Sequence, residues 1–240
     1  MIQYLPNYIT VVFELTTLAT LIIFYFAVRN ATIKHPVYTS TILLILLNTW
    51  LLIQGLLTLR NFYNLNTHAF PPSIILAVFP PLSAIVILFI TKKGRVFIHG
   101  LPLIYITYLN IVRIPVELVL YWLSLHKVVP ELMTFAGRNF DILAGITAPF
   151  IAYFGFQKHK IPILYILIWN FISLGLLLNI GKDAVLSAPF VFQKFAFDQP
   201  NIAILNFPFS WLPAFIVPVI LFGHLVSITQ LIKKLNNKPL

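Results

Sequence analysis

Long apolar runs recur along the chain, and they restrict its fold more than any other feature. A helix needs about 20 apolar residues to cross the roughly 30 Å hydrocarbon core of a bilayer. The sequence therefore predicts an all-α, polytopic membrane bundle of seven transmembrane helices, of which the fifth is short. The predicted spans are 9–29, 37–58, 71–91, 101–124, 141–156, 161–180 and 201–231.

Composition supports this class of protein. Hydrophobic residues make up 60% of the 240 residues and charged residues only 9%, too few to cover a water-soluble globule. The N-terminus, "MIQYLPNYIT", has neither a basic region nor a small-residue cleavage site, so we expect the first span to be retained rather than removed as a signal peptide. No linker, low-complexity tract or convincing repeat divides the chain, and one transmembrane domain, 1–240, is expected.

The basic residues predict the orientation of the bundle. The segments after the first, third and fifth spans and the C-terminal tail hold ten Lys and Arg, and the other three connections hold five. Because Lys and Arg favour the cytoplasmic side, the N-terminus is expected outside and the C-terminus inside. The net charge of +10 is explained by this asymmetry, and no nucleic-acid partner is expected. The ten are Arg29, Lys34, Lys92, Lys93, Arg95, Lys158, Lys160, Lys233, Lys234 and Lys238.

Two outer connections are longer than a turn requires. Residues 125–140 mix apolar and polar side chains, and residues 181–200 carry four phenylalanines beside Lys194 and Asp198. Aromatic rings with polar neighbours are typical of the membrane interface. We therefore expect both to be short interfacial segments in the outer leaflet, with ordinary aromatic-rich loops as the alternative.

A polar stripe on the fourth span is the main candidate for a site. Its members are three or four residues apart, which places them on one helix face. Because a charge at the bilayer centre costs on the order of 3 kcal/mol, the stripe is expected to face protein or water. Arg113 and Glu117 are expected to pair across one turn, and Pro115 to open the helix between them. The stripe consists of Thr107, Asn110, Arg113, Glu117, Tyr121 and Ser124.

Polar residues at similar depths on other spans extend this prediction to an outward-opening polar cavity. We expect it to bind a small molecule or lipid. The alternative is that the charged pair and the amides only hold helices together. The candidate ligand-binding residues are Arg113, Glu117, Asn110, Tyr121, Glu14, Asn48, Gln54, Asn139, Asp141, Asn170 and Asn206.

Known catalytic and cofactor motifs are missing from the sequence. The six histidines are dispersed without an HExxH pair, there is no cysteine, and no metal site or cofactor is expected. His224 is the histidine well inside the last span, and we interpret it as a packing residue. Residues 201–231 contain no lysine for a retinal Schiff base. No GxSxG, P-loop or GxGxxG motif occurs either.

Three functions remain open. The first is binding, with or without translocation, of a small polar or amphiphilic solute, in which Arg113 engages an anionic group and Glu14 or Glu117 couples a proton. The second is an intramembrane enzyme acting on a lipid or isoprenoid with Glu117 as general acid or base. The third is a non-catalytic sensor or complex subunit. Membrane lipids are expected as neighbours, and the compact loops favour a bacterial inner membrane.

Overall fold

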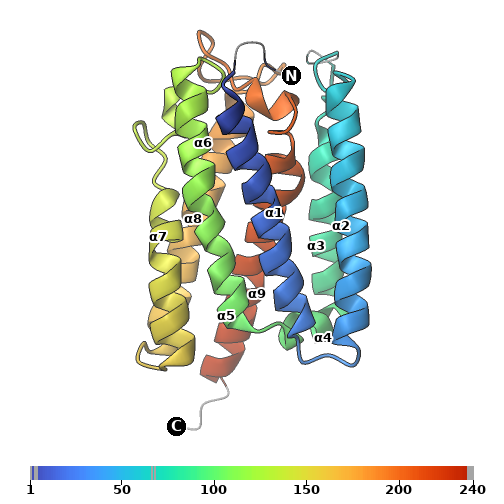
Figure 1. The fold of residues 1–240 in the computed structure, drawn as a ribbon. Coiled ribbons are helices and arrows are strands. Elements are labelled where there is room, and N and C mark those ends of the chain that lie inside the picture. Colours follow the sequence, from blue (N-terminus) through green and yellow to red (C-terminus); the bar gives the residue numbers. More distant parts are fainter. Residues whose placement is uncertain (1, 3–4, 66, 68, 237–240) are drawn as a thin grey trace.

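The protein is a bundle of helices that run side by side between two ends, with the N-terminus at one end and the C-terminus at the other (Figure 1). A computed structural model describes residues 2, 5–65, 67 and 69–236, and no strand occurs among them. The helices are α1 Asn7–Arg29, α2 Pro36–Leu59, α3 Ile75–Ile90, α4 Lys92–Gly100, α5 Leu103–Tyr108, η1 Leu109–Val112, α6 Arg113–Leu125, η2 Glu131–Met133, α7 Ile142–Phe150, η3 Ile151–Gln157, α8 Ile163–Leu186, η4 Ala203–Leu205, η5 Leu212–Ile216 and α9 Val217–Asn236.

The all-helical, membrane-type bundle predicted from the sequence is confirmed. Five helical stretches of the described chain are long and apolar enough to cross a membrane, and α3 with α4 makes a sixth if the bent pair is one span. The stretch Ile142–Gln157 is apolar but shorter. The five stretches are Asn7–Arg29, Pro36–Leu59, Leu103–Leu125, Ile163–Leu186 and Leu212–Asn236.

Two predicted boundaries are wrong at the end of the bundle that holds the N-terminus. The seventh span was expected from residue 201, but its helix begins at Leu212. Pro208 has no N–H and disfavours helical backbone at the residue before it, so the chain stays irregular there apart from one short turn, η4. Conversely, α8 continues to Leu186, so the first part of the expected interfacial segment 181–200 is helical.

A short helix, α4, was missed. The chain turns by 94° between α3 and α4 and crosses the C-terminal end of the bundle (Figure 1). The Thr91 hydroxyl accepts a hydrogen bond from the Gly94 N–H at 3.1 Å, which caps the new helix. A Cβ at position 94 would overlap the backbone of Leu88, so glycine is required for this turn. The basic residues Lys92, Lys93 and Arg95 in this segment predict a loop rather than a helix.

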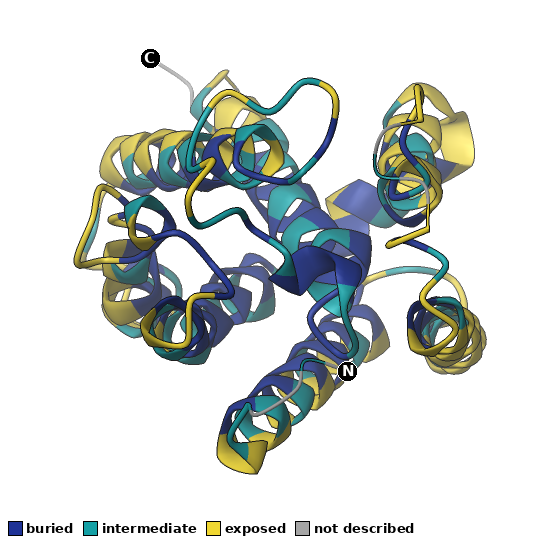
Figure 2. Ribbon diagram, turned by 90° about the horizontal axis from the view of Figure 1, so that it is seen from above, coloured by how far each residue is buried: buried dark blue, intermediate teal, exposed yellow. Residues whose placement is uncertain are grey.

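Helix α9 and the faces turned toward it form the core. Viewed along the bundle, buried residues gather around α9, while the outward faces of the surrounding helices are exposed (Figure 2). Those outward faces are apolar, with large side chains such as Leu46, Leu52 and Phe79 among the exposed ones. An apolar exterior of this extent suits contact with hydrocarbon rather than water.

Candidate functional site

The first candidate site is a buried polar cluster around Arg113. Arg113 opens α6 near the middle of the stretch Leu103–Leu125, and its side chain is 1% exposed. Its Nε donates to Asp141 Oδ2 at 2.7 Å, and its Nη2 donates to Asp141 Oδ1 and to the Ser173 carbonyl. Its Nη1 donates to Asn110 Oδ1 at 3.1 Å and lies 3.2 Å from His224 Nε2. One guanidinium thus joins four helical segments.

The expected pairing of Arg113 with Glu117 is wrong. Side chains on a helix lean toward its N-terminus, so Arg113 reaches toward Asn110 and away from Glu117. The ion-pair partner of Arg113 is Asp141. Glu117 instead accepts a hydrogen bond at Oε1 from Asn139 Nδ2 at 2.7 Å. Its second oxygen, Oε2, is buried without a partner among the described residues.

Asp141 lies at the N-cap of α7, the helix of the fifth predicted span. The non-helical chain before α7 descends into the bundle, and this brings Asp141 beside Arg113, a contact that the sequence did not predict. Asn139 organises this descent, because its Oδ1 accepts the Asp141 N–H at 3.0 Å and its Nδ2 donates to the Met133 carbonyl at 3.0 Å. Irregular backbone at this depth needs such internal partners.

A glycine permits the close approach that places Asp141. A Cβ added at Gly145 would lie 2.8 Å from Ile114 Cγ1 and 3.2 Å from the Asn110 carbonyl oxygen. Glycine at this position therefore lets α7 press directly against η1 and the start of α6. That contact sets Asp141, one turn earlier, within reach of the guanidinium.

His224 extends the cluster to α8. Its Nδ1 lies 3.1 Å from Asn170 Oδ1, and Asn170 Nδ2 donates to the Ile166 carbonyl at 2.9 Å. The sequence singled out His224 by its depth but gave it only a packing role. Nothing in the sequence indicates that Ser173 contributes its backbone carbonyl. The structure therefore brings together Asn110, Arg113, Glu117, Asn139, Asp141 and Asn170, and adds His224 and Ser173.

The other five predicted site residues lie elsewhere. Glu14 and Asn48 line a groove of about 380 Å³ between α1 and α2. Tyr121 stacks on Phe135, with ring centroids 4.9 Å apart. Asn206 donates to the Ile202 carbonyl at 2.9 Å, and Gln54 accepts a hydrogen bond from Tyr63. The eleven candidates are therefore divided between the Arg113 cluster and four other places in the bundle.

Tyr63 lies in the connection after α2 and is fully buried. Burial raises the pKa of its phenol to about 12, and the hydrogen bond to Gln54 acts in the opposite direction. The phenol therefore stays protonated and holds this connection on the end of α2.

The second candidate site is an apolar chamber of about 320 Å³ that the sequence did not predict. It lies between α2 and α3 on one side and η5 and α9 on the other, with contributions from α1 and α4, and it is partly open to the exterior. Helices α2 and α3 stand apart from each other on this side of the bundle (Figure 2). The lining residues are Phe24, Leu43, Leu46, Leu47, Trp50, Pro80, Pro81, Ala84, Ile85, Leu88, Phe97, Ala214, Phe215, Pro218, Val219 and Phe222.

Hydrogen bonds from two tryptophans hold the chamber wall. Pro218 has no N–H to donate to the carbonyl of Ala214 four residues earlier, and the Trp50 indole N–H donates to that carbonyl at 2.9 Å. In the other direction, the Trp211 indole donates to the Leu51 carbonyl at 2.9 Å. These two hydrogen bonds hold α2 against the start of the last span. The neighbouring face of α2 lines the chamber.

No metal site emerges within residues 5–65 and 69–236. No group of three or more His, Asp and Glu side chains there is arranged to hold a metal ion. Comparison with protein-family models, curated proteins and solved structures finds no match to the chain.

Proposed function

We propose that this chain is a seven-span integral membrane protein that binds a membrane amphiphile in the apolar chamber between α2, α3, η5 and α9. The observation that carries the proposal is the chamber itself, a volume of about 320 Å³ lined almost wholly by apolar side chains and partly open to the exterior. Apolar pockets of 300 Å³ or more are typical ligand sites. In a bilayer, the molecules that reach such an opening are lipids and other amphiphiles.

Seven spans follow if two incomplete helices are counted as crossing. Helix α3, 16 residues long, is one of them, and α4 turns away from it by 94° at the C-terminal end of the bundle. The helix Ile142–Gln157 is shorter than a full span. The non-helical chain that descends before it covers the remaining depth of the bilayer. Termini at opposite ends support an odd number of spans (Figure 1). The excess of Lys and Arg at the C-terminal end supports an outside N-terminus in a bacterial inner membrane.

In this proposal the Arg113 cluster is a rigid support next to the chamber. It joins η1, α6, α7, α8 and α9, and α9 also supplies Pro218 and Phe222 to the chamber wall. Glu117 is 1% exposed and hydrogen bonded to Asn139. We therefore do not assign it the acid or base role that a lipid-modifying enzyme requires.

Filling the chamber tests the proposal. Ala84 lines the chamber on α3, whereas Val86, two residues later, does not. Ala84→Trp is expected to lower the amount of lipid that co-purifies with the protein, measured by native mass spectrometry, while Val86→Trp retains it. Equal lipid retention by both variants would refute a ligand chamber at this place.

A second candidate function is favoured by the groove between α1 and α2. It has a volume of about 380 Å³ and carries the Glu14 carboxylate and the Asn48 amide. A carboxylate in an otherwise apolar groove suits a small solute bearing an amine. Uptake of labelled amines into proteoliposomes tests this candidate, with Glu14→Gln expected to abolish uptake and Glu131→Gln to leave it unchanged.

A further inference from the structure

Helix α4 is an amphipathic helix fixed across the C-terminal end of the bundle. Gly94, Ile98 and Gly100 are buried, whereas Lys92, Lys93, Arg95 and His99 are exposed. One face therefore packs on the bundle and the other carries positive charge. Such helices lie in the plane of a membrane interface.

The end of α4 is anchored by hydrogen bonds to two other elements. Gln230 of α9 donates through Nε2 to the carbonyls of Ile98 at 2.7 Å and Leu101 at 2.9 Å. The Thr32 N–H donates to the Gly100 carbonyl at 2.8 Å. The positions of the basic groups on α4 are consequently defined relative to α9.

A basic cradle forms where α4 meets the last turns of α9. His99, Gln230, Lys233 and Lys234 border a hollow of about 350 Å³. Partial desolvation of the largely exposed imidazole lowers the pKa of His99, and the positive charges of Lys233 and Arg95 lower it further. Lys233 and Lys234 have no carboxylate within 4.0 Å in the described part of the chain.

Within the described chain, no acidic residue compensates the charge around the cradle. Among the described segments at this end of the bundle, 30–35, 91–102, 158–162 and 232–236, none contains an Asp or Glu. Both amide hydrogens of Gln230 are already donated to backbone carbonyls, so this residue positions the cradle. The two ammonium groups and the imidazole are left to bind an anion.

We propose that the cradle of His99, Lys233 and Lys234 binds the phosphate of an anionic phospholipid in the leaflet at the C-terminal end. A phosphodiester offers oxygens that accept from ammonium and imidazole donors. The lipid is favoured over a free anion because α4 lies at the membrane surface, where basic clusters next to a span attract anionic headgroups. This inference does not depend on occupation of the apolar chamber.

Lipid retention by the purified full-length protein tests this site. The protein is equilibrated with a mixture of phosphatidylglycerol and phosphatidylcholine, and retained lipid is measured by native mass spectrometry. The wild type is expected to prefer phosphatidylglycerol. The double variant Lys233→Gln with Lys234→Gln is expected to weaken the binding of phosphatidylglycerol by ~30-fold, because each basic residue near the membrane surface contributes a similar share of the binding free energy. Lys233→Arg with Lys234→Arg keeps the charge and is expected to retain the lipid.

A matched control removes the same charge at the same end of the bundle. Lys158→Gln with Lys160→Gln alters a basic turn outside the cradle and is expected to leave the preference unchanged. An equal loss in this control, or no preference in the wild type, would overturn the proposal in favour of diffuse surface charge. Displacement of phosphatidylglycerol by inorganic phosphate alone would overturn it in favour of a free-anion site. Thermal melting of each variant excludes loss of fold as the cause.

Discussion

Arg113 makes hydrogen bonds to four residues, and these four residues lie in four different parts of the fold. Asp141 supplies the compensating charge, and Asn110, His224 and the Ser173 carbonyl occupy the remaining donors. Removing one partner of a buried pair leaves the other charge without compensation. The cluster should therefore be sensitive to conservative changes that keep side-chain volume.

Arg113→Gln and Asp141→Asn are each expected to lower the free energy of unfolding by about 3–5 kcal/mol, the usual cost of breaking a buried ion pair from one side. Denaturation in detergent measures this loss. The double variant is expected to recover part of it, because neither charge is then left alone. Additive losses in the double variant would contradict the pairing.

Arg138→Gln is the comparison for this pair. Arg138 donates to Asp183 at 3.1 Å, but its side chain is half exposed and Lys182 lies 3.5 Å from the same carboxylate. Asp183 is buried, but Lys182 still compensates its charge when Arg138 is removed, so the loss of stability is expected to be smaller than for a fully buried pair. The free energy of unfolding of the Arg138 variant should accordingly be much closer to that of the wild type than the value for either cluster variant.

Tyr63 gives a pH-dependent prediction. Because burial raises the pKa of Tyr63 from 10.0 to about 12, the unfolded chain loses this proton first as pH rises. The folded state is therefore expected to lose stability between these two values. The difference in ultraviolet absorbance between the wild type and Tyr63→Phe, followed during an alkaline titration, should show a tyrosinate transition near pH 12. A transition at the ordinary value would mean that Tyr63 is not buried.

Single residues show where sequence reasoning succeeds and where it stops. The spacing of Asn110, Arg113 and Glu117 predicts a common face, and all three are buried. The sequence cannot tell which carboxylate Arg113 meets, because Asp141 is brought close by a non-helical descent that has no periodicity. The sequence singled out His224 by its depth, but its contact with Arg113, and that of the Ser173 carbonyl, could not be predicted, because packing sets the rotation of α8 and α9.

At the scale of elements, close helix contacts depend on glycine at some positions and not at others. Gly145→Ala is expected to separate α7 from η1, because the added Cβ would lie 2.8 Å from Ile114 Cγ1 and 3.2 Å from a backbone oxygen. Overpacking of this kind costs about 1–3 kcal/mol. Gly175→Ala on α8 meets nothing within 4 Å and should stabilise the helix by up to about 1 kcal/mol.

Thermal melting of the two glycine variants in one detergent measures both effects. Opposite shifts in melting temperature are expected, downward for Gly145→Ala and upward or absent for Gly175→Ala. A downward shift of the same size in both would show that the close contact at Gly145 is not the cause.

The ends of a helix could be predicted where an apolar run in the sequence marks them. Helices α1 and α2 begin and end within two residues of the predicted runs 9–29 and 37–58. Helix α4 was missed because its nine residues are too few and too basic to read as a span. The chamber was equally hidden, because a wall of Leu, Ile, Phe and Pro has the composition of any membrane helix.

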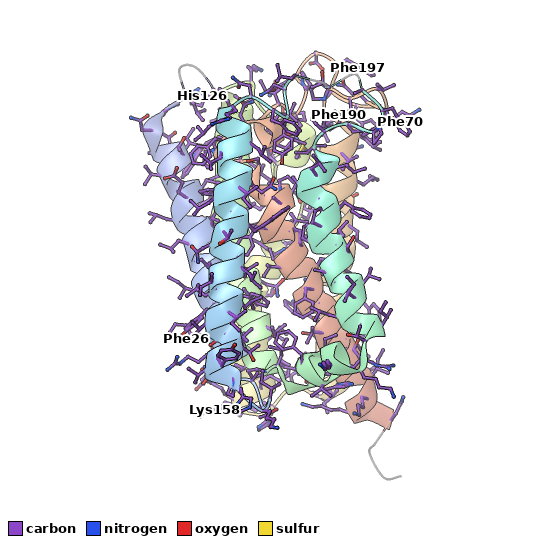
Figure 3. All side chains as sticks on the ribbon, turned by 90° about the vertical axis from the view of Figure 1, so that its right-hand side faces the viewer. Phe26, Phe70, His126, Lys158, Phe190 and Phe197 are labelled. Carbon is purple, nitrogen blue, oxygen red and sulfur yellow. The ribbon has the colours of Figure 1, made fainter. Side chains whose placement is uncertain are left out.

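For the whole molecule, the distribution of basic residues between the two ends supports one orientation. Phe70, His126, Phe190 and Phe197 lie at the end that holds the N-terminus, and Phe26 and Lys158 lie at the opposite end (Figure 3). The acid-free basic segments all lie at that second end. The proposed lipid cradle needs this end to face the leaflet that is richer in anionic lipid, which is the cytoplasmic one.

Cysteine labelling tests the orientation, because the chain contains no cysteine of its own. Phe197→Cys places a thiol on an exposed loop, where the native side chain is 72% exposed. Gln157→Cys places one beside Lys158 without altering any charge. A membrane-impermeant maleimide added to intact cells should label the first variant, and the second only after the membrane is permeabilised, because basic segments stay in the cytoplasm. Labelling of Gln157→Cys in intact cells would invert the bundle, and the cradle of Lys233 and Lys234 would then face the leaflet with fewer anionic headgroups.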